Sequence, residues 1–303
     1  MDSPVALFLL SVAGICLTGA IGEIVFRKTQ IPDVLWLLAV GVALGPVTGI
    51  VHRDQLMAIA PYFAALTLVV VLFDGGSQLK LGSVSSVGGR AAGLALLSFV
   101  LSVVAVTGVS FLLGQLGVLP ASWTLNHGLL LGSILGGSSS VIVIPSMALA
   151  RVEPRTANLV GLESAFTDAL CVVGASTMMS ILSSAEAASE PLHLALTRSF
   201  GVGLGFGLVA GACWILMLRA LKGSSHAYPV TLAALLALYV VIERWRGSAA
   251  LGILAFAVVV GNAGPIAKKL GATSEIDLGP GVRDVHAQVA FFIKSFFFAF
   301  IGA

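Results

Sequence analysis

Residues 158 to 173 read Asn-Leu-Val-Gly-Leu-Glu-Ser-Ala-Phe-Thr-Asp-Ala-Leu-Cys-Val-Val, an apolar run that contains two carboxylates, Glu163 and Asp168. The run belongs to a longer apolar stretch, residues 158–183, which is long enough to cross the hydrocarbon core of a bilayer as a helix. A carboxylate inside a span costs at least a few kcal/mol, so it marks a functional site or a buried ion pair. This stretch therefore decides the fold class and directs the search for function.

The composition of the whole chain agrees with a membrane-spanning fold. Of 303 residues, 58% are hydrophobic and 10% are charged, and the mean hydropathy is +1.05. Soluble domains carry about 25% charged residues, which they need to cover their surface. The composition therefore predicts an all-α polytopic membrane protein in contact with the lipid bilayer. The net charge of +2 is too small for a nucleic-acid footprint, so no nucleic acid is expected as a partner.

Ten apolar runs are each a candidate transmembrane helix. They lie near residues 4–26, 31–51, 56–74, 91–119, 128–150, 158–183, 194–221, 227–242, 247–262 and 285–303. We expect one transmembrane domain over residues 1–303, in which 261–284 is the longest polar loop. The last run has no polar cap at its end, which predicts that further spans follow.

Basic residues predict the orientation, because cytoplasmic loops accumulate Lys and Arg. Odd-numbered loops and their flanks hold eleven of them, whereas even-numbered loops hold four. This bias places the amino terminus outside, in a multi-pass protein of the inner or plasma membrane. Lys294 is the one basic residue well inside a run.

The run that precedes Asp168 is interrupted by residues that break helices. It contains Gly136-Gly137-Ser138-Ser139-Ser140 and then Pro145. An unwound stretch at that depth is tolerated where it is buried in protein or lines a cavity. Unwinding frees backbone carbonyls, which with the hydroxyls are the hard oxygen ligands that an alkali cation needs. We expect a broken helix near 136–145 and a cation site with Asp168; the alternative is a packing face of small residues.

The two carboxylates of the 158–183 run point about 140° apart around a helix. They therefore need different partners. We expect Glu163 to form a structural ion pair with Lys294, which leaves Asp168 as the carboxylate that binds the cation and the proton. The alternative is that Lys294 neutralises Asp168.

Glycines within the runs indicate close helix packing. The 194–221 run holds Gly201, Gly203, Gly205, Gly207 and Gly211. Small residues at such spacings let helix backbones approach each other, and this packing is the role that we expect for them.

Two other classes of function remain open. A membrane-embedded serine hydrolase needs a histidine within the spans, but the five histidines fall in loops or at the ends of runs, so we expect no enzyme. A non-transporting scaffold or sensor would use the buried acids only as structural pairs.

Three stretches resemble the monovalent cation:proton antiporter superfamily, the sodium/hydrogen exchanger family. Leu72-Phe73-Asp74-Gly75-Gly76 resembles its third-helix motif, and Gly137-Ser138-Ser139-Ser140-Val141 stands in place of its Thr-Asp-Pro or Thr-Ser-Pro crossing. Glu163-Ser164 with Thr167-Asp168 resembles its Glu-Ser-x-x-Asn-Asp signature, although Thr167 replaces the Asn or Asp before the essential Asp. Lys294 before Ser295-Phe296-Phe297-Phe298 resembles the helix that bears the basic residue of the family.

The resemblance implies an inverted-repeat fold. It also implies a transporter that exchanges Na⁺ or K⁺ for H⁺ by alternating access, without a cofactor. Asp168 would be the shared ion and proton site, assisted by Thr167, Ser138, Ser139 and Ser140. Supporting roles are expected for Ser164 and Asp74. A homodimer is favoured, and a K⁺ efflux system of the same superfamily is the alternative transporter.

Overall fold

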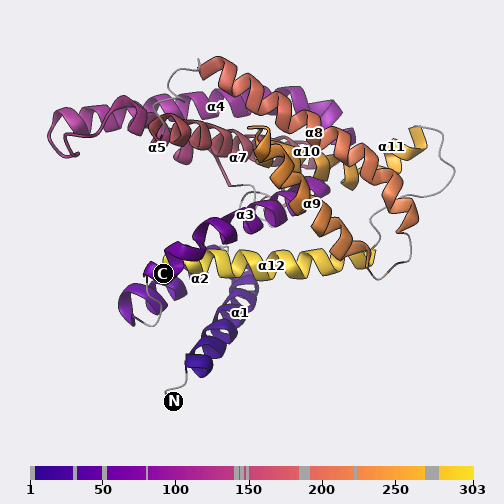
Figure 1. Ribbon diagram of the computed structural model, residues 1–303, viewed down its shortest axis with the longest axis horizontal. Helices are drawn as coiled ribbons and strands as arrows, with labels where there is room; N and C mark the ends of the chain where they lie inside the picture. Colours follow the sequence, from indigo (N-terminus) through magenta and orange to yellow (C-terminus); the bar gives the residue numbers. More distant parts are fainter. Residues whose placement is uncertain are drawn as a thin grey trace. The chain divides into compact units, whose positions relative to one another are not determined.

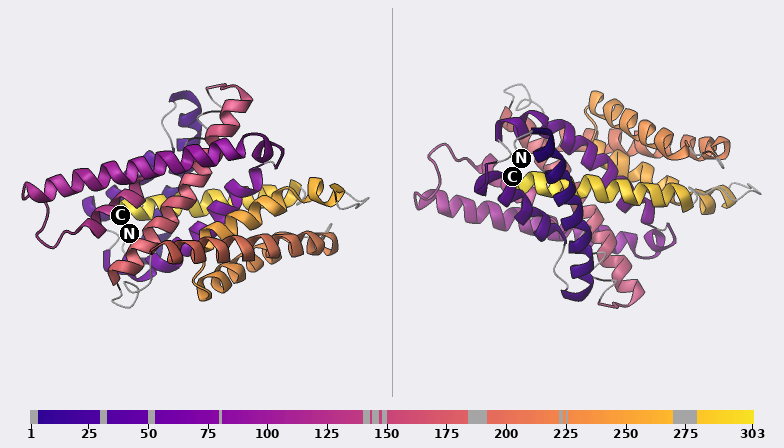
Figure 2. Two further views of the ribbon diagram at one scale, coloured as in Figure 1. Left: turned by 90° about the horizontal axis from the view of Figure 1, so that it is seen from above. Right: turned by 90° about the horizontal axis from the view of Figure 1, so that it is seen from below.

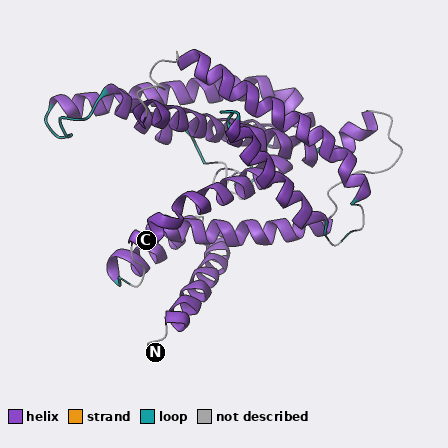
Figure 3. Ribbon diagram, in the orientation of Figure 1, coloured by secondary structure: helices purple, strands orange, loops and turns teal. Residues whose placement is uncertain are grey.

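The computed structural model describes most of the chain. The described residues are 4–29, 33–49, 53–79, 81–139, 143, 147, 150–183, 192–221, 224, 226–269 and 280–303. Every regular element in them is a helix (Figure 3). The predicted all-α fold class is therefore confirmed.

Each of the ten apolar runs contains a helix. The helices are α1 (Pro4–Thr29), α2 (Asp33–Val42) with the π-helical turn η1 (Ala43–Val47), α3 (Arg53–Gln78), α4 (Leu81–Gln115), α5 (Leu125–Leu135), α7 (Pro154–Ser183), α8 (Leu192–Ala220), α9 (Ala227–Arg244), α10 (Ala249–Gly261), α11 (Ala263–Lys269) and α12 (Pro280–Gly302). Six helices of the described residues are long and apolar enough to cross a membrane, and shorter apolar segments come from α1, α2 with η1, α5 and α10. The predicted number of ten spans is therefore approximate.

Part of the expected polar loop at 261–284 is helical. It contains α11 and the first turn of α12, and residues 270–279 between them lie outside the described part. Pro280 stands at the first position of α12, where its missing N–H costs nothing.

The chain forms two compact units, and the first comprises Met1–Asp74, Lys222–Leu236 and Leu278–Ala303. In this unit α12 packs along α2, and α1 crosses α12 (Figure 1). Ile15, Leu37 and Ala299 form the buried centre of that contact. Gly41 permits the close approach, because a Cβ there would overlap the carbonyl oxygen of Ala299.

The second unit comprises Gly75–Leu221 and Ala237–Asp277. Here α4 lies beside α5 and α7 (Figure 2), and α8 packs along α10. Gly203, Gly207 and Gly211 face α10, whereas a Cβ on Gly201 or Gly205 would meet nothing within 4 Å. The expected packing role is therefore confirmed for three of the five glycines of α8, which are spaced four residues apart and so share one face.

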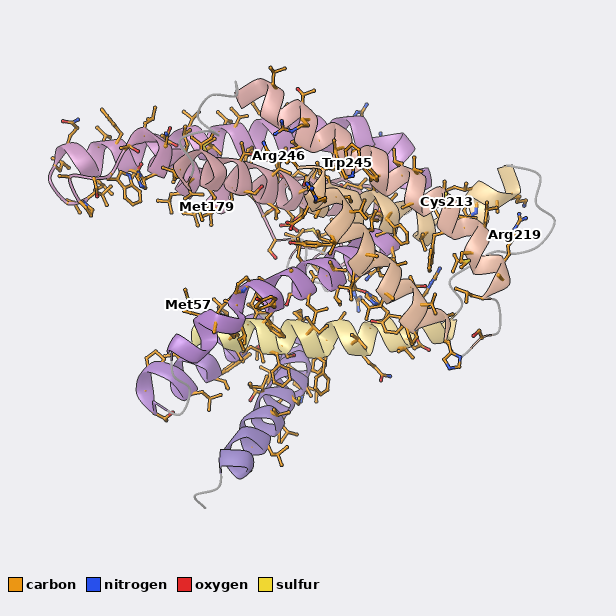
Figure 4. All side chains as sticks on the ribbon, viewed as in Figure 1. Met57, Met179, Cys213, Arg219, Trp245 and Arg246 are labelled. Carbon is orange, nitrogen blue, oxygen red and sulfur yellow. The ribbon has the colours of Figure 1, made fainter. Side chains whose placement is uncertain are left out.

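Large apolar side chains are exposed on many helices, as expected where lipid covers them. Met179 on α7 and Cys213 on α8 lie on such exposed faces (Figure 4). On α4, Leu101, Val104 and Phe111 are exposed in the same way.

Candidate ion-binding site

The predicted break follows directly after α5. The helix begins with a capping box between Thr124 and His127, ends at Leu135, and is followed by non-helical residues 136–139. The interruption that the glycines and serines predict is therefore confirmed in its described part. Ser140 and Pro145 lie outside the described residues.

A stripe of glycines on α5 positions the break that follows this helix. Gly128 and Gly132 face Thr107 of α4, and Gly136 faces Phe99 one turn further on. These glycines recur every four residues and so occupy one face of α5. The stripe lays the carboxyl end of α5 along α4 and close to α7.

The unwound residues lie against the turn of α7 that carries Asp168. A Cβ on Gly137 would lie 2.7 Å from Cys171 Sγ and 3.2 Å from Thr167 Cβ. Asp168 follows Thr167 directly and is half-buried. The structure therefore brings the interrupted stretch and the Asp168 turn together. That they form a cation site stays a prediction.

Hydroxyl groups link the break to α7, and another hydroxyl links α4 to α7. Ser164 Oγ donates to the carbonyl oxygen of Ser138 over 2.6 Å, and Ser138 Oγ lies 3.1 Å from Glu163 Oε2. Ser98 of α4 donates to Glu163 Oε1 over 2.9 Å. Glu163 is only 9% exposed, so these hydrogen bonds stabilise its carboxylate in place of water.

The donor set near Asp168 suits a hard cation. Thr167 and Ser164 are fully buried, and the Thr167 hydroxyl donates to the Ser164 carbonyl over 2.9 Å. Ser138 is half-buried and bonds to Ser164, one turn before Asp168, and Ser139 is exposed. Carboxylate, carbonyl and hydroxyl oxygens are ligands for hard cations. Among the described residues, no three His, Cys, Asp or Glu side chains gather into a metal site.

The partners of Glu163 in this unit are serines that the sequence did not assign to it. Its carboxylate oxygens accept hydrogen bonds from Ser98 and Ser138. Lys294 lies on α12 and belongs to the other compact unit. The ion pair between Glu163 and Lys294 stays a prediction.

His286 is a buried polar residue that the sequence reading missed. It lies within α12, is 4% exposed, and its Nε2 is 3.7 Å from Asp74 Oδ1. Its Nδ1 lies 3.3 Å from the Tyr228 hydroxyl. His286 therefore lies in the second turn of α12, further inside a helix than the sequence reading placed it. Pro280 is the signal that could have corrected it, because proline favours the first turn of a helix.

Comparison with known proteins now decides the family. The family model described as "Sodium/hydrogen exchanger, transmembrane" matches residues 12–303. The chain belongs to the sodium/hydrogen exchanger family. Membership points to transport rather than to catalysis.

Relatives of the chain carry names of both sodium and potassium antiporters. It is 26% identical over 266 residues to the K(+)/H(+) antiporter NhaP of Alkalimonas amylolytica, covering 85% of this chain and 43% of the relative. It is 25% identical over 223 residues to Na(+)/H(+) antiporter 1 of Methanocaldococcus jannaschii, covering 73% of this chain and 51% of the relative. The chain thus spans about half the length of these relatives.

The fold of the chain is that of a solved antiporter. It matches the structure of the sodium proton antiporter MjNhaP1 from Methanocaldococcus jannaschii with a TM-score of 0.79 and 21% identity. The match covers 99% of this chain and 71% of that chain. At this identity the likeness establishes the fold alone.

Proposed function

We propose that the protein exchanges a monovalent cation, Na⁺ or K⁺, for H⁺ by alternating access, with Asp168 as the shared binding site. The observation that carries the proposal is the contact between the interrupted stretch after α5 and the Asp168 turn of α7, where Gly137 lies against Thr167 and Cys171. Serine hydroxyls and backbone carbonyls of the interrupted stretch then lie beside the helix that carries the Asp168 carboxylate. If one carboxylate cannot hold both ions, cation binding expels the proton, and exchange follows.

Family membership and the names of the relatives support a cation:proton antiporter. Both Na⁺ and K⁺ occur in those names, so a potassium efflux system is the second candidate. We also propose an inner or plasma membrane location, an amino terminus outside, and a homodimer as the working assembly. The experiment described next distinguishes an antiporter from a scaffold or sensor that transports no ion.

The test is ion exchange by the purified full-length protein in sealed lipid vesicles. With an acidic interior and a pH-sensitive dye trapped inside, external Na⁺ or K⁺ should raise the internal pH. Choline, which is too large for a dehydrated alkali-cation site, should not. Protein-free vesicles provide the background, and no response above it would contradict antiport.

Serine hydroxyls of the break should set the affinity for the cation. Replacing Ser138, Ser139 and Ser140 together by Ala should raise the apparent KM for the cation by about fivefold or more, because at least one oxygen ligand is lost. The folded protein should persist, since the Ser164 hydroxyl bonds the backbone carbonyl of Ser138. Ser176→Ala is the control, because that hydroxyl donates to its own helix at Val173. An unchanged KM would remove the serines from the site.

Exchange should be electroneutral. Thr167 is neutral where the resemblance leads one to expect Asn or Asp, so Asp168 supplies one negative charge and one proton leaves for each cation that binds. The initial rate should therefore stay constant when a diffusion potential of either sign is imposed across the vesicle membrane. A rate that follows the potential would contradict this stoichiometry, and with it the structural pairing of Glu163 with Lys294.

A further inference from the structure

Ser98 lies in the middle of an apolar helix, where sequence patterns give it no role. Its hydroxyl oxygen is 2.9 Å from Glu163 Oε1 and 3.2 Å from the Ala95 carbonyl oxygen. We propose that Ser98 and Glu163 are positioning residues of the cation site. Ser98 fixes the Glu163 carboxylate, and Glu163 accepts a hydrogen bond from the Ser138 hydroxyl, so that the Ser138 oxygen offers its lone pairs to the cation. The inference rests on the proposed function.

The hydrogens in this network are limited in number. Each serine hydroxyl has one proton to donate and two lone pairs. The Ser164 proton is committed to the Ser138 carbonyl, over 2.6 Å. The Ser138 hydroxyl has two acceptors at 3.1 Å, Glu163 Oε2 and Ser164 Oγ. Because an ionised carboxylate is the stronger acceptor, the Ser138 proton points at Glu163.

The direction of that proton matters for a cation. A hydroxyl oxygen binds a cation through its lone pairs, and a proton that pointed at the ion would repel it. Glu163 offers only acceptors when ionised, so it holds the Ser138 proton away. Glu163 can accept the Ser138 hydrogen bond only while its Oε2 faces Ser138. The hydrogen bond from Ser98 to Oε1 holds the carboxylate in that orientation.

The first test replaces Ser98 in the full-length protein in vesicles. Ser98→Ala should raise the apparent KM for the cation about fivefold, the factor for one hydrogen bond of ordinary net strength, and leave the maximal rate nearly unchanged. Ser98→Thr keeps the hydroxyl and should restore most of the affinity. Ser110→Ala is the matched control, because Ser110 is a buried serine of α4 whose hydroxyl donates to Thr107 of its own helix. An unchanged KM in Ser98→Ala would overturn the proposal.

A double-mutant cycle separates positioning from general loosening of the fold. If Ser98 acts through Glu163 on Ser138, then Ser98→Ala should no longer change KM when Ser138→Ala is already present, because the hydroxyl to be oriented is gone. Ser110→Ala should have the same negligible effect in both backgrounds. Equal, additive effects of Ser98→Ala in the two backgrounds would overturn the coupling.

A binding measurement keeps this inference distinct from the proposed function. Cations that bind the folded state raise the melting temperature in detergent by mass action. Ser98→Ala should shift the NaCl or KCl concentration needed for that rise about fivefold upward, against choline chloride at equal ionic strength. Wild-type protein that is stabilised by the cation but does not exchange it would defeat the proposed function alone. Identical concentration dependence in wild type and Ser98→Ala would defeat the role of Ser98.

Discussion

Asp168→Asn should abolish cation:proton exchange in vesicles. Asn has nearly the same size as Asp but neither carries a charge nor binds an exchangeable proton, so both halves of the exchange lose their site. Removing one partner of a buried charged pair costs about 3 to 5 kcal/mol, which corresponds to a loss of affinity of roughly a hundredfold or more. The rate of dye response to Na⁺ or K⁺ should fall to that of protein-free vesicles.

One control variant and one further measurement sharpen this result. Asp284→Asn makes the same chemical change at an exposed position of α12 and should retain the wild-type rate. Size-exclusion profiles of Asp168→Asn in detergent should match the wild type, which separates a lost site from a lost fold. If Asp168→Asn exchanged cations at the wild-type rate, the shared site would have to lie elsewhere.

Gly207→Val should destabilise the protein strongly, whereas Gly205→Val on the same helix should not. A Cβ on Gly207 would overlap the carbonyl oxygen of Gly252 and lie 2.8 Å from Gly252 Cα and 2.9 Å from Ala255 Cβ. The obstacle is partly backbone of α10, which cannot rotate away as a side chain would. Overpacking costs about 1 to 3 kcal/mol and occasionally more, and we expect the upper end of that range.

The Gly205→Val control carries the same change in helix propensity and in side-chain size. A Cβ on Gly205 meets nothing within 4 Å, so only the contact with α10 differs between the two variants. The measurement is thermal unfolding in detergent, together with the fraction of monodisperse protein. Equal losses in both variants would mean that α8 does not depend on its close approach to α10.

Several features could be predicted from the sequence, because they depend on residues that are neighbours in the chain. Hydropathy located the helices, since the free energy of burying a segment in lipid is close to a sum over its own side chains. Two glycines followed by serines located the break after α5, since local backbone propensity ends a helix. The signature around Glu163 and Asp168 directed attention to α7 in the same way.

Other features depended on which helices touch. Ser98 contacts Glu163 across 65 positions of sequence, and its own surroundings in the chain resemble any other apolar run. The spacing of Gly203, Gly207 and Gly211 marks one face, but only the tertiary structure identifies α10 as the helix against it. The sequence reading gave Glu163 one partner, a lysine, whereas the structure gives its oxygens two serine donors.

The sequence by itself determined that this chain is a helical membrane protein with a broken helix beside a carboxylate-bearing one, because transfer into lipid and helix breaking are local properties of the chain. Only the tertiary structure decided which hydroxyls surround Glu163 and which glycines lie between helices. Those contacts depend on the packing of helices far apart in sequence, and the free energy of packing is set by shape complementarity between them rather than by the residues of either helix alone.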